Sequence, residues 1–135
     1  MKKLIVGLLM LVPVLVLAGC SKTYEVYFPV QKSDNLDQME ALLQGTLELD
    51  DDGWLRVESG GDSHVIIWPY GFEIKGGEKE IKIHNGAGQA VAVVGETIQL
   101  SGGSVTQEVA ETYTGQGIPD GLGGSFWIAS EVVSQ

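Results

Sequence analysis

Hydrophobic and polar residues alternate through most of the chain after residue 45, with the period of two that is typical of β-strands. Turn-forming residues such as Asp51-Asp52-Gly53 and Asn85-Gly86 separate the alternating segments. The first two segments and the turn between them predict a hairpin over residues 45–58. The predicted strands are GTLELD (45–50), WLRVE (54–58), HVIIW (64–68), EIKIH (80–84), AVAVV (90–94), TIQL (97–100) and SFWIASEVV (125–133).

Two segments before residue 45 have other patterns. Residues 24–30, YEVYFPV, alternate and predict a strand or an extended arm, with Pro29 favouring an edge position. Residues 34–44 carry four apolar residues at helical spacing before Gly45, namely Leu36, Met39, Leu42 and Leu43, which predicts a short helix. The chain is therefore predicted to be all-β, with one short helix before a domain over residues 45–133. That domain is either a small antiparallel β-barrel of the OB-like kind or a sandwich.

The first 20 residues have the layout of a secretory signal. Lys2 and Lys3 precede an uncharged, almost wholly apolar run from Leu4 to Cys20. The run is shorter than the roughly 20 residues that a membrane span needs, and it contains Gly7 and Pro13. We therefore expect export with cleavage rather than a spanning helix.

The stretch Leu17-Ala18-Gly19-Cys20 resembles the lipobox of bacterial lipoprotein precursors. The resemblance implies a signal peptide over residues 1–19, cleavage between Gly19 and Cys20, lipid attached to Cys20, and a tether over residues 20–33. It predicts an exported protein, anchored by lipid to the cell membrane or the outer membrane. The alternative is that Cys20 belongs to an ordinary cleaved leader. Cys20 is the only cysteine, so no internal disulfide can form.

Residues 45–130 resemble a small all-β domain found in uncharacterised bacterial lipoproteins. The resemblance is carried by GTLELDDDGWLRV, IIWPYGF, VAVVGETIQLSGG and SFWIASEV, together with an Asn-Gly turn. These are strand and turn features, so they imply an architecture rather than an activity. That domain often carries cysteines in the first hairpin and before the last strand, where this chain has Trp54 and residues 122–125.

The chain is acidic, with 18 acidic and 8 basic residues and a formal net charge of −10. Cleavage after Gly19 would remove two lysines and no acidic residue, which changes the charge to −12. Such a surface repels nucleic acids and anionic lipid heads, so we expect no nucleic-acid partner and membrane contact through lipid alone.

Metal and cofactor motifs are weak. An EF-hand alignment of Asp50-Asp51-Asp52-Gly53 places Ser59 where a bidentate glutamate is required, so a hairpin turn is the better interpretation, with weak calcium binding left open. His64 and His84 lack a ligand cluster, and we predict no metal site. The glycine-rich segment 114–124 predicts a surface loop rather than a nucleotide site, and no cofactor is expected.

No catalytic motif is apparent, and we predict no enzymatic activity. Ser63 and His64 are neighbours on a predicted strand and point to opposite faces, so they cannot pair as a triad requires.

The aromatic residues are the best candidates for ligand contacts. Trp54 shares the polar face of its hairpin with Arg56 and Glu58, which predicts an exposed side chain. Trp68, Tyr70 and Trp127 are further candidates, although a place in the barrel core is the better interpretation of Trp68 and Trp127.

We therefore expect a non-enzymatic, lipid-anchored module that binds an envelope glycan, peptide or protein. The alternatives are an accessory subunit of an envelope complex and a hydrolase of envelope polymers that uses His64 and the acidic groups near it.

Overall fold

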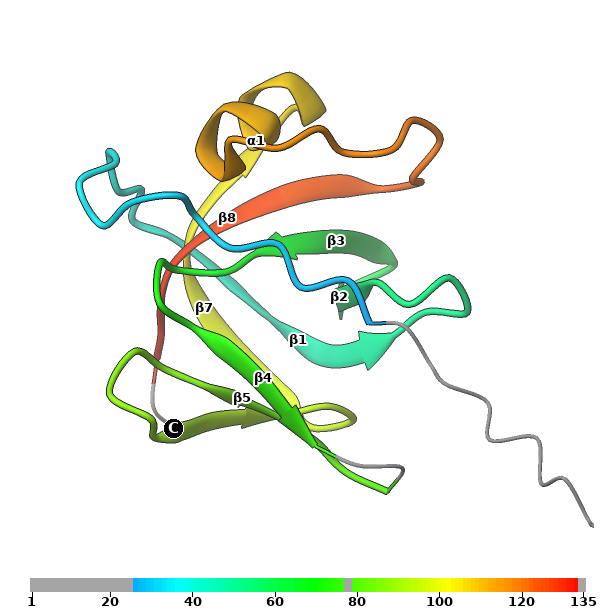
Figure 1. The fold of residues 1–135 in the computed structure, drawn as a ribbon. Helices are drawn as coiled ribbons and strands as arrows, with labels where there is room; N and C mark the ends of the chain where they lie inside the picture. Colours follow the sequence, from blue (N-terminus) through cyan, green and yellow to red (C-terminus); the bar gives the residue numbers. More distant parts are fainter. Residues whose placement is uncertain (1–25, 77–78, 134–135) are drawn as a thin grey trace, which may run out of the picture.

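Five strands close into a barrel in the computed structural model of the protein, which describes residues 26–76 and 79–133 (Figure 1). The barrel order is β1-β2-β3-β8-β7, and a separate three-stranded sheet has the order β4-β5-β6. The elements are β1 (Ala41–Leu49), β2 (Leu55–Ser59), β3 (Asp62–Ile67), β4 (Glu73–Gly76), β5 (Ile81–His84), β6 (Ala90–Val93), β7 (Thr97–Val105), α1 (Gln107–Thr114) and β8 (Ser125–Val132).

The barrel confirms the all-β prediction, and closure decides for a barrel over a sandwich. The barrel differs from the predicted antiparallel one in a single pairing, because β3 and β8 are parallel, with His64 opposite Ser125. The chain reaches β8 from β7 through α1 and the long segment 115–124, so β8 can return beside β3 in the same direction. The sheet β4-β5-β6 is inserted between β3 and β7, and β4 was not predicted as a strand.

The helix predicted over residues 34–44 is absent, and this prediction was wrong. Residues 34–36 form a turn, and β1 begins at Ala41. Leu43 pairs with Leu100 of β7 and is buried in the barrel. Leucines at helical spacing are also compatible with a strand when a distant strand pairs with that segment. Here the pairing with β7 outweighs the local helix propensity.

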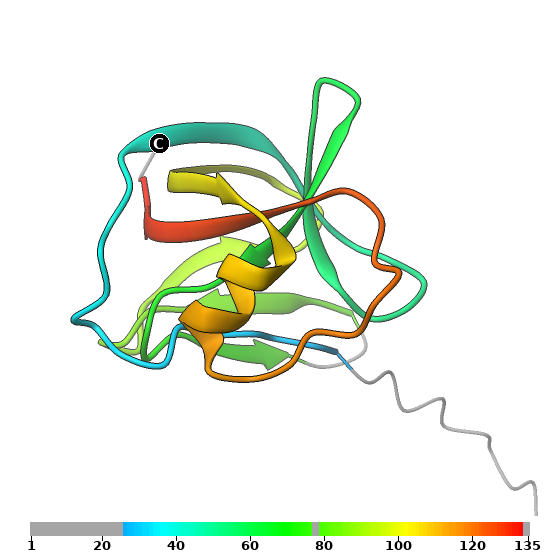
Figure 2. The same ribbon diagram turned by 90° about the horizontal axis from the view of Figure 1, so that it is seen from above.

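The helix of the described chain is α1, which the sequence pattern did not predict. The Thr106 side chain caps its first turn by accepting a hydrogen bond from the Val109 N–H, and Gly115 ends the helix with φ of 69°. Seen from above, α1 lies over the barrel and the orange segment after it curves round to β8 (Figure 2). In the described part of the chain, no helix is long and apolar enough to cross a membrane.

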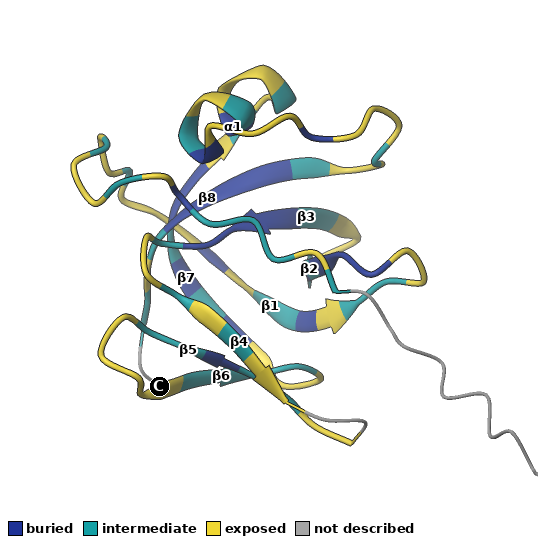
Figure 3. Ribbon diagram, in the orientation of Figure 1, coloured by how far each residue is buried: buried dark blue, intermediate teal, exposed yellow. Residues whose placement is uncertain are grey.

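Apolar side chains form two clusters on opposite faces of the barrel strands. The interior cluster fills the barrel and reaches the sheet β4-β5-β6 through Ile83 of β5; its buried members are Leu43, Leu47, Leu55, Val57, Ile66, Trp68, Ile83, Ile98, Leu100, Trp127 and Ala129. The outer cluster lies between the barrel wall and α1 with its following segment; its members are Trp54, Val65, Ile67, Ala110, Ile118, Phe126 and Ile128. The buried positions of β3 and β8 stand out in Figure 3, where β4 is largely exposed.

Residues 26–32 form an extended arm that runs along the barrel, as one of the two sequence interpretations expected. Its backbone bridges in parallel to Trp54 at Tyr27 and to Trp68 at Val30. The buried Gln31 side chain donates from Nε2 to the Ala129 carbonyl at 2.6 Å. This part of the predicted tether therefore packs on the barrel, whereas residues 1–25, with Gly19 and Cys20, lie outside the described residues.

Candidate functional site

A groove of about 510 Å³ opens where the arm, the turn between β3 and β4, and the end of α1 meet. We call it the aromatic groove. Its lining residues are Phe28, Pro29, Val30, Gln31, Lys32, Tyr70, Gly71, Phe72, Glu73, Thr114 and Gln116. Pockets of this size hold small molecules or short polymer segments.

Aromatic rings form the base of this groove. Trp68 is fully buried and stacks against Phe28, with ring centroids 5.4 Å apart, and against Phe72 at 6.4 Å. Phe28 and Phe72 face the groove, and Trp68 lies behind them. The backbone of Trp68 is joined to the arm by two hydrogen bonds: its N–H donates to the Pro29 carbonyl at 2.9 Å, and its carbonyl accepts the Gln31 N–H at 2.8 Å.

Polar and charged groups surround the aromatic base. Tyr70 is 56 % exposed, and Lys32 and Glu73 supply opposite charges at exposed positions. A tight turn presents Tyr70: the Phe72 N–H bonds to the Pro69 carbonyl at 3.2 Å, and Gly71 adopts φ of 81°. A positive φ at the third turn position is readily adopted by glycine, so this residue allows the turn.

Tyr70 is the only one of the four predicted ligand-binding aromatics that lies at the surface of this groove. Trp68 (fully buried) and Trp127 (6 % exposed) belong to the interior cluster, which confirms the alternative interpretation of these two residues. The groove residues of the arm were not predicted, because only the packing of the arm beside the β3–β4 turn brings them together.

The prediction that Trp54 is exposed was wrong. Its side chain lies on the outer face, as the alternation indicated, but it is only 6 % exposed. The ring of Tyr27 stacks on it at 4.7 Å with an interplanar angle of 11°, and the outer cluster surrounds it. The reason is that a second layer covers the outward face of this hairpin.

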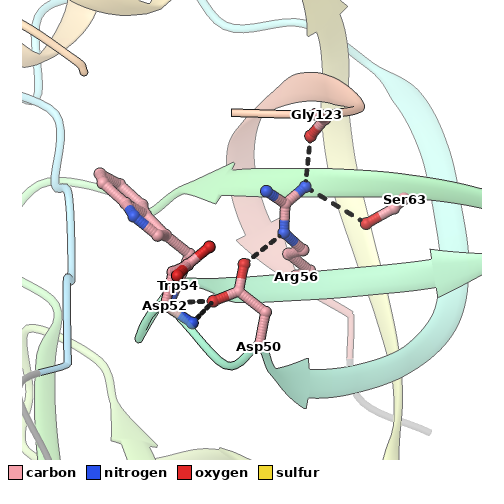
Figure 4. Close-up of polar contacts among 6 residues, drawn as sticks. All are labelled: Asp50, Asp52, Trp54, Arg56, Ser63 and Gly123. Atoms are coloured by element: carbon pink, nitrogen blue, oxygen red, sulfur yellow. Dashed lines mark hydrogen bonds and ion pairs between the residues drawn. The ribbon is translucent and has the colours of Figure 1, made fainter. Parts of the chain in front are cut away.

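A polar cluster centred on Arg56 joins the first hairpin to the segment before β8 (Figure 4). Arg56 donates to the Asp50 carboxylate at 2.7 Å, to the Gly123 carbonyl at 2.5 Å, and to the Ser63 hydroxyl at 3.4 Å. The other Asp50 oxygen accepts the N–H groups of Asp52 and Trp54, at 2.9 and 2.8 Å. Both carboxylate oxygens are thus engaged within the turn.

The pKa of Asp50 reflects this cluster. Burial by itself would raise the pKa, but the hydrogen bond from Arg56, the two backbone N–H bonds and the Arg56 charge outweigh burial and lower the pKa below its usual range. Asp50 is therefore a structural carboxylate. Within residues 26–76 and 79–133, no group of three or more histidine, cysteine or acidic side chains could hold a metal ion.

His64 contacts a serine, though not the one next to it. Ser63 bonds to Arg56 on the outer face, while the His64 Nδ1 lies 2.5 Å from the Ser125 Oγ. The parallel pairing of β3 with β8 places these two residues opposite each other, 61 positions apart in sequence. His64 also contacts Trp127 edge to face, at 5.9 Å between ring centroids. The sequence offered no local signal for this pair.

No protein-family model matches the chain, and neither a curated protein nor a solved structure matches it.

Proposed function

We propose that the protein is a lipid-anchored module of the bacterial cell envelope that binds an envelope ligand in the aromatic groove and catalyses no reaction. The observation that carries the proposal is the groove itself, which the exposed Tyr70 lines together with Phe28, Phe72, Lys32 and Glu73. The leader and its resemblance to a lipobox support the location, and anchoring would be through lipid on Cys20.

The chemistry of the groove favours a ligand with both an apolar face and polar edges. A sugar ring stacks on tyrosine through its C–H face and uses its hydroxyls toward charged side chains, and a peptide segment offers the same combination. An envelope glycan or peptide is therefore the ligand class we propose, and another envelope protein would bind through such a segment.

Tryptophan fluorescence tests the proposal, because Trp68 lies directly behind Phe28 and Phe72 and reports on the groove. The full chain in mild detergent is titrated with peptidoglycan fragments and with envelope glycans. We expect a saturable change that Tyr70→Ala weakens by about fivefold or more, the equivalent of one aromatic contact of about 1 kcal/mol. Leu42→Ala is the matched control, because Leu42 is also exposed but does not line the groove.

Two results would contradict the binding module. One is no response to any ligand from a protein whose circular dichroism shows it to be folded, and the other is a response that Tyr70→Ala leaves unchanged. Co-purification with one stoichiometric partner after mild detergent extraction would then favour the accessory-subunit alternative.

The anchor has a separate test. Cells that express the protein are labelled with a palmitate analogue, and the protein is compared with Cys20→Ser. We expect label on the wild-type chain and none on the variant, because Cys20 is the only cysteine. Label retained by Cys20→Ser would contradict lipid attachment at this residue.

A hydrolase of envelope polymers is the second candidate, and the Ser125–His64 contact favours it. Histidine in contact with a serine hydroxyl is the arrangement of a general base and its nucleophile. Fluorophosphonate labelling that Ser125→Ala abolishes and Ser63→Ala preserves, together with release of products from peptidoglycan, would support this candidate. Absence of both labelling and product release would exclude it.

A further inference from the structure

Two opposite charges, Lys32 and Glu73, line the aromatic groove at exposed positions. Lys32 belongs to the arm: its backbone N–H donates to the Tyr113 carbonyl at 2.9 Å, and its stem lies against Gly115, where an added Cβ would come within 3.3 Å of the Lys32 Cδ. Glu73 begins β4 and pairs with His84 of β5. The backbone of each charged residue is therefore held by a different part of the fold.

Neither charge is neutralised by a neighbour that the structure describes. The ion pairs within residues 26–76 and 79–133 are Arg56–Asp50 and Lys82–Glu80. His84 lies opposite Glu73, but its Nδ1 contacts the Gly88 carbonyl of its own turn at 3.1 Å and makes no ion pair with Glu73. Among the described residues, both charges of the groove are therefore free to bind a ligand.

Two uncharged polar side chains of the groove lining are already engaged within the protein. Gln31 is buried and donates from Nε2 to the Ala129 carbonyl at 2.6 Å. The Thr114 hydroxyl donates to the Glu111 carbonyl at 3.2 Å and accepts the Gln116 N–H at 3.1 Å. A neutral glycan needs uncharged groups of this kind for its hydroxyls, whereas a ligand with charged ends can form charge-assisted hydrogen bonds to the two free charges. The lining thus favours a charged ligand over a neutral glycan.

We propose that the ligand of the aromatic groove is a short zwitterionic peptide segment, with its carboxylate at Lys32, its cation at Glu73 and an apolar side chain on Phe28 and Phe72. This choice of ligand rests on the proposed function and narrows its ligand class to peptides. A zwitterion has no net charge, so the formal net charge of −10 does not repel it. Three extended residues span about 10 Å, a length that suits a groove of about 510 Å³.

Four forms of one tripeptide, alanyl-leucyl-alanine, test the proposal. The free form carries both charges, the N-acetylated form lacks the cation, the C-terminal amide lacks the carboxylate, and the doubly blocked form lacks both. Each is titrated at low salt and neutral pH into the full chain in mild detergent, with tryptophan fluorescence as the signal. We expect each charge to strengthen binding about threefold, as exposed ion pairs do, so that the free form binds about tenfold more tightly than the doubly blocked form.

Variants assign each ligand charge to one side chain. Lys32→Gln should weaken the free and the acetylated peptide about threefold and leave the amide unchanged, because the amide has no carboxylate to lose. Glu73→Gln should weaken the free peptide and the amide and leave the acetylated form unchanged. Lys75→Gln is the matched control, because Lys75 is an exposed lysine of β4 that does not line the groove, and it should keep the wild-type order of the four peptides.

Three results would overturn this choice of ligand while the proposed function stands. One is equal binding of the four peptides that Tyr70→Ala still weakens, which would leave aromatic contact as the whole attraction. Another is a neutral oligomer of N-acetylglucosamine that binds more tightly than the free peptide and depends on Tyr70. The third is a loss in Lys75→Gln as large as that in Lys32→Gln, which would show attraction to the surface charge in general. The absence of any binding that depends on Tyr70 would instead contradict the proposed function itself.

Discussion

The interior cluster and the outer cluster bury similar apolar side chains but are enclosed by different means. The barrel strands and the sheet β4-β5-β6 enclose the interior cluster, and the arm packs against Trp68 through Phe28 and Val30. The outer cluster is covered by the eight residues of α1 and by the segment 115–124, which Ile118 and the Arg56 bonds hold down. The comparison teaches that one cluster depends on the whole sheet, whereas the other depends on a few local contacts.

The largest effect is expected inside the barrel. Trp68→Ala removes a fully buried side chain that two phenylalanines contact, and should lower the free energy of unfolding by about 3–5 kcal/mol. Urea unfolding followed by circular dichroism measures the loss as one cooperative transition. Tyr70→Ala is the control, with a change within about 0.5 kcal/mol, because Tyr70 is exposed. A loss below about 1 kcal/mol for Trp68→Ala would contradict the role given to the interior cluster.

Removing the polar cluster of Arg56 should come next. Arg56→Ala breaks the bonds to Asp50 and Gly123 and leaves the Asp50 carboxylate without its charged partner, at a cost of about 2–3 kcal/mol. Arg56→Lys restores the charge but cannot bond to Asp50 and Gly123 at once as the guanidinium does, and should recover only part of the lost stability. Thermal unfolding of the three proteins measures this order, and equal stability of Arg56→Ala and wild type would contradict it.

Truncating a side chain of the outer cluster should destabilise its cover, α1 and residues 115–124, more than the barrel. Ile118→Ala should cost about 2 kcal/mol, toward the low end for a buried isoleucine because the exposed neighbouring loop can relax. Amide hydrogen exchange should rise first in α1 and residues 115–124, while β1 and β7 stay protected. A uniform rise across all strands would show that the two clusters unfold as one unit.

The Asp50 carboxylate should make stability depend on pH at the acidic end. Its pKa is lowered in the folded protein, so its stabilisation is fully present above the pKa of the unfolded chain and is lost as the pH falls through the folded pKa. Asp50→Asn should remove about 1–2 kcal/mol at neutral pH and flatten this part of the acid profile. Denaturant unfolding at a series of pH values below 5 measures how the free energy of unfolding changes with pH in the wild type and in Asp50→Asn. The same pH dependence in both proteins would contradict the role given to the Asp50 carboxylate.

The smallest effect is expected where the cover meets the chain before β1. The Tyr113 hydroxyl donates to the Asp37 carbonyl at 3.0 Å, in an exposed position. Tyr113→Phe should cost about 0.5–1 kcal/mol, because water replaces the lost partner. A midpoint shift in thermal unfolding measures it; a loss as large as that of Ile118→Ala would mean that this contact, rather than apolar packing, holds the cover.

Sequence patterns predicted most strands because alternation is a local property of the chain. The hairpin over residues 45–58 was correct down to its turn, where Asp50 and Gly53 form the predicted tight connection. The prediction of a helix over residues 34–44 was wrong because the spacing of the leucines is compatible with a helix, whereas the pairing of Leu43 with β7 cannot be seen in the local sequence. The helix α1 was missed because it is short and its capping residues, Thr106 and Gly115, are common elsewhere in the chain.

The candidate sites were harder to predict than the strands. Alternation placed Trp54 on the outward face correctly, but exposure depends on whether a second layer covers that face. The aromatic groove combines the arm, one turn and the end of α1, and the contact between His64 and Ser125 depends on the parallel pairing of β3 with β8. Such contacts join residues far apart in sequence, so the local periodicity of the chain cannot predict them.

The sequence by itself determined the all-β character, the positions of most turns and the acidic charge. These depend on residue type and spacing, which are local. Only the tertiary structure decided that β8 runs parallel to β3, that a second layer buries Trp54, and that Tyr70 lines a groove together with Phe28 and Phe72. The physical reason is that exposure and pairing depend on which distant segments the closed barrel brings together.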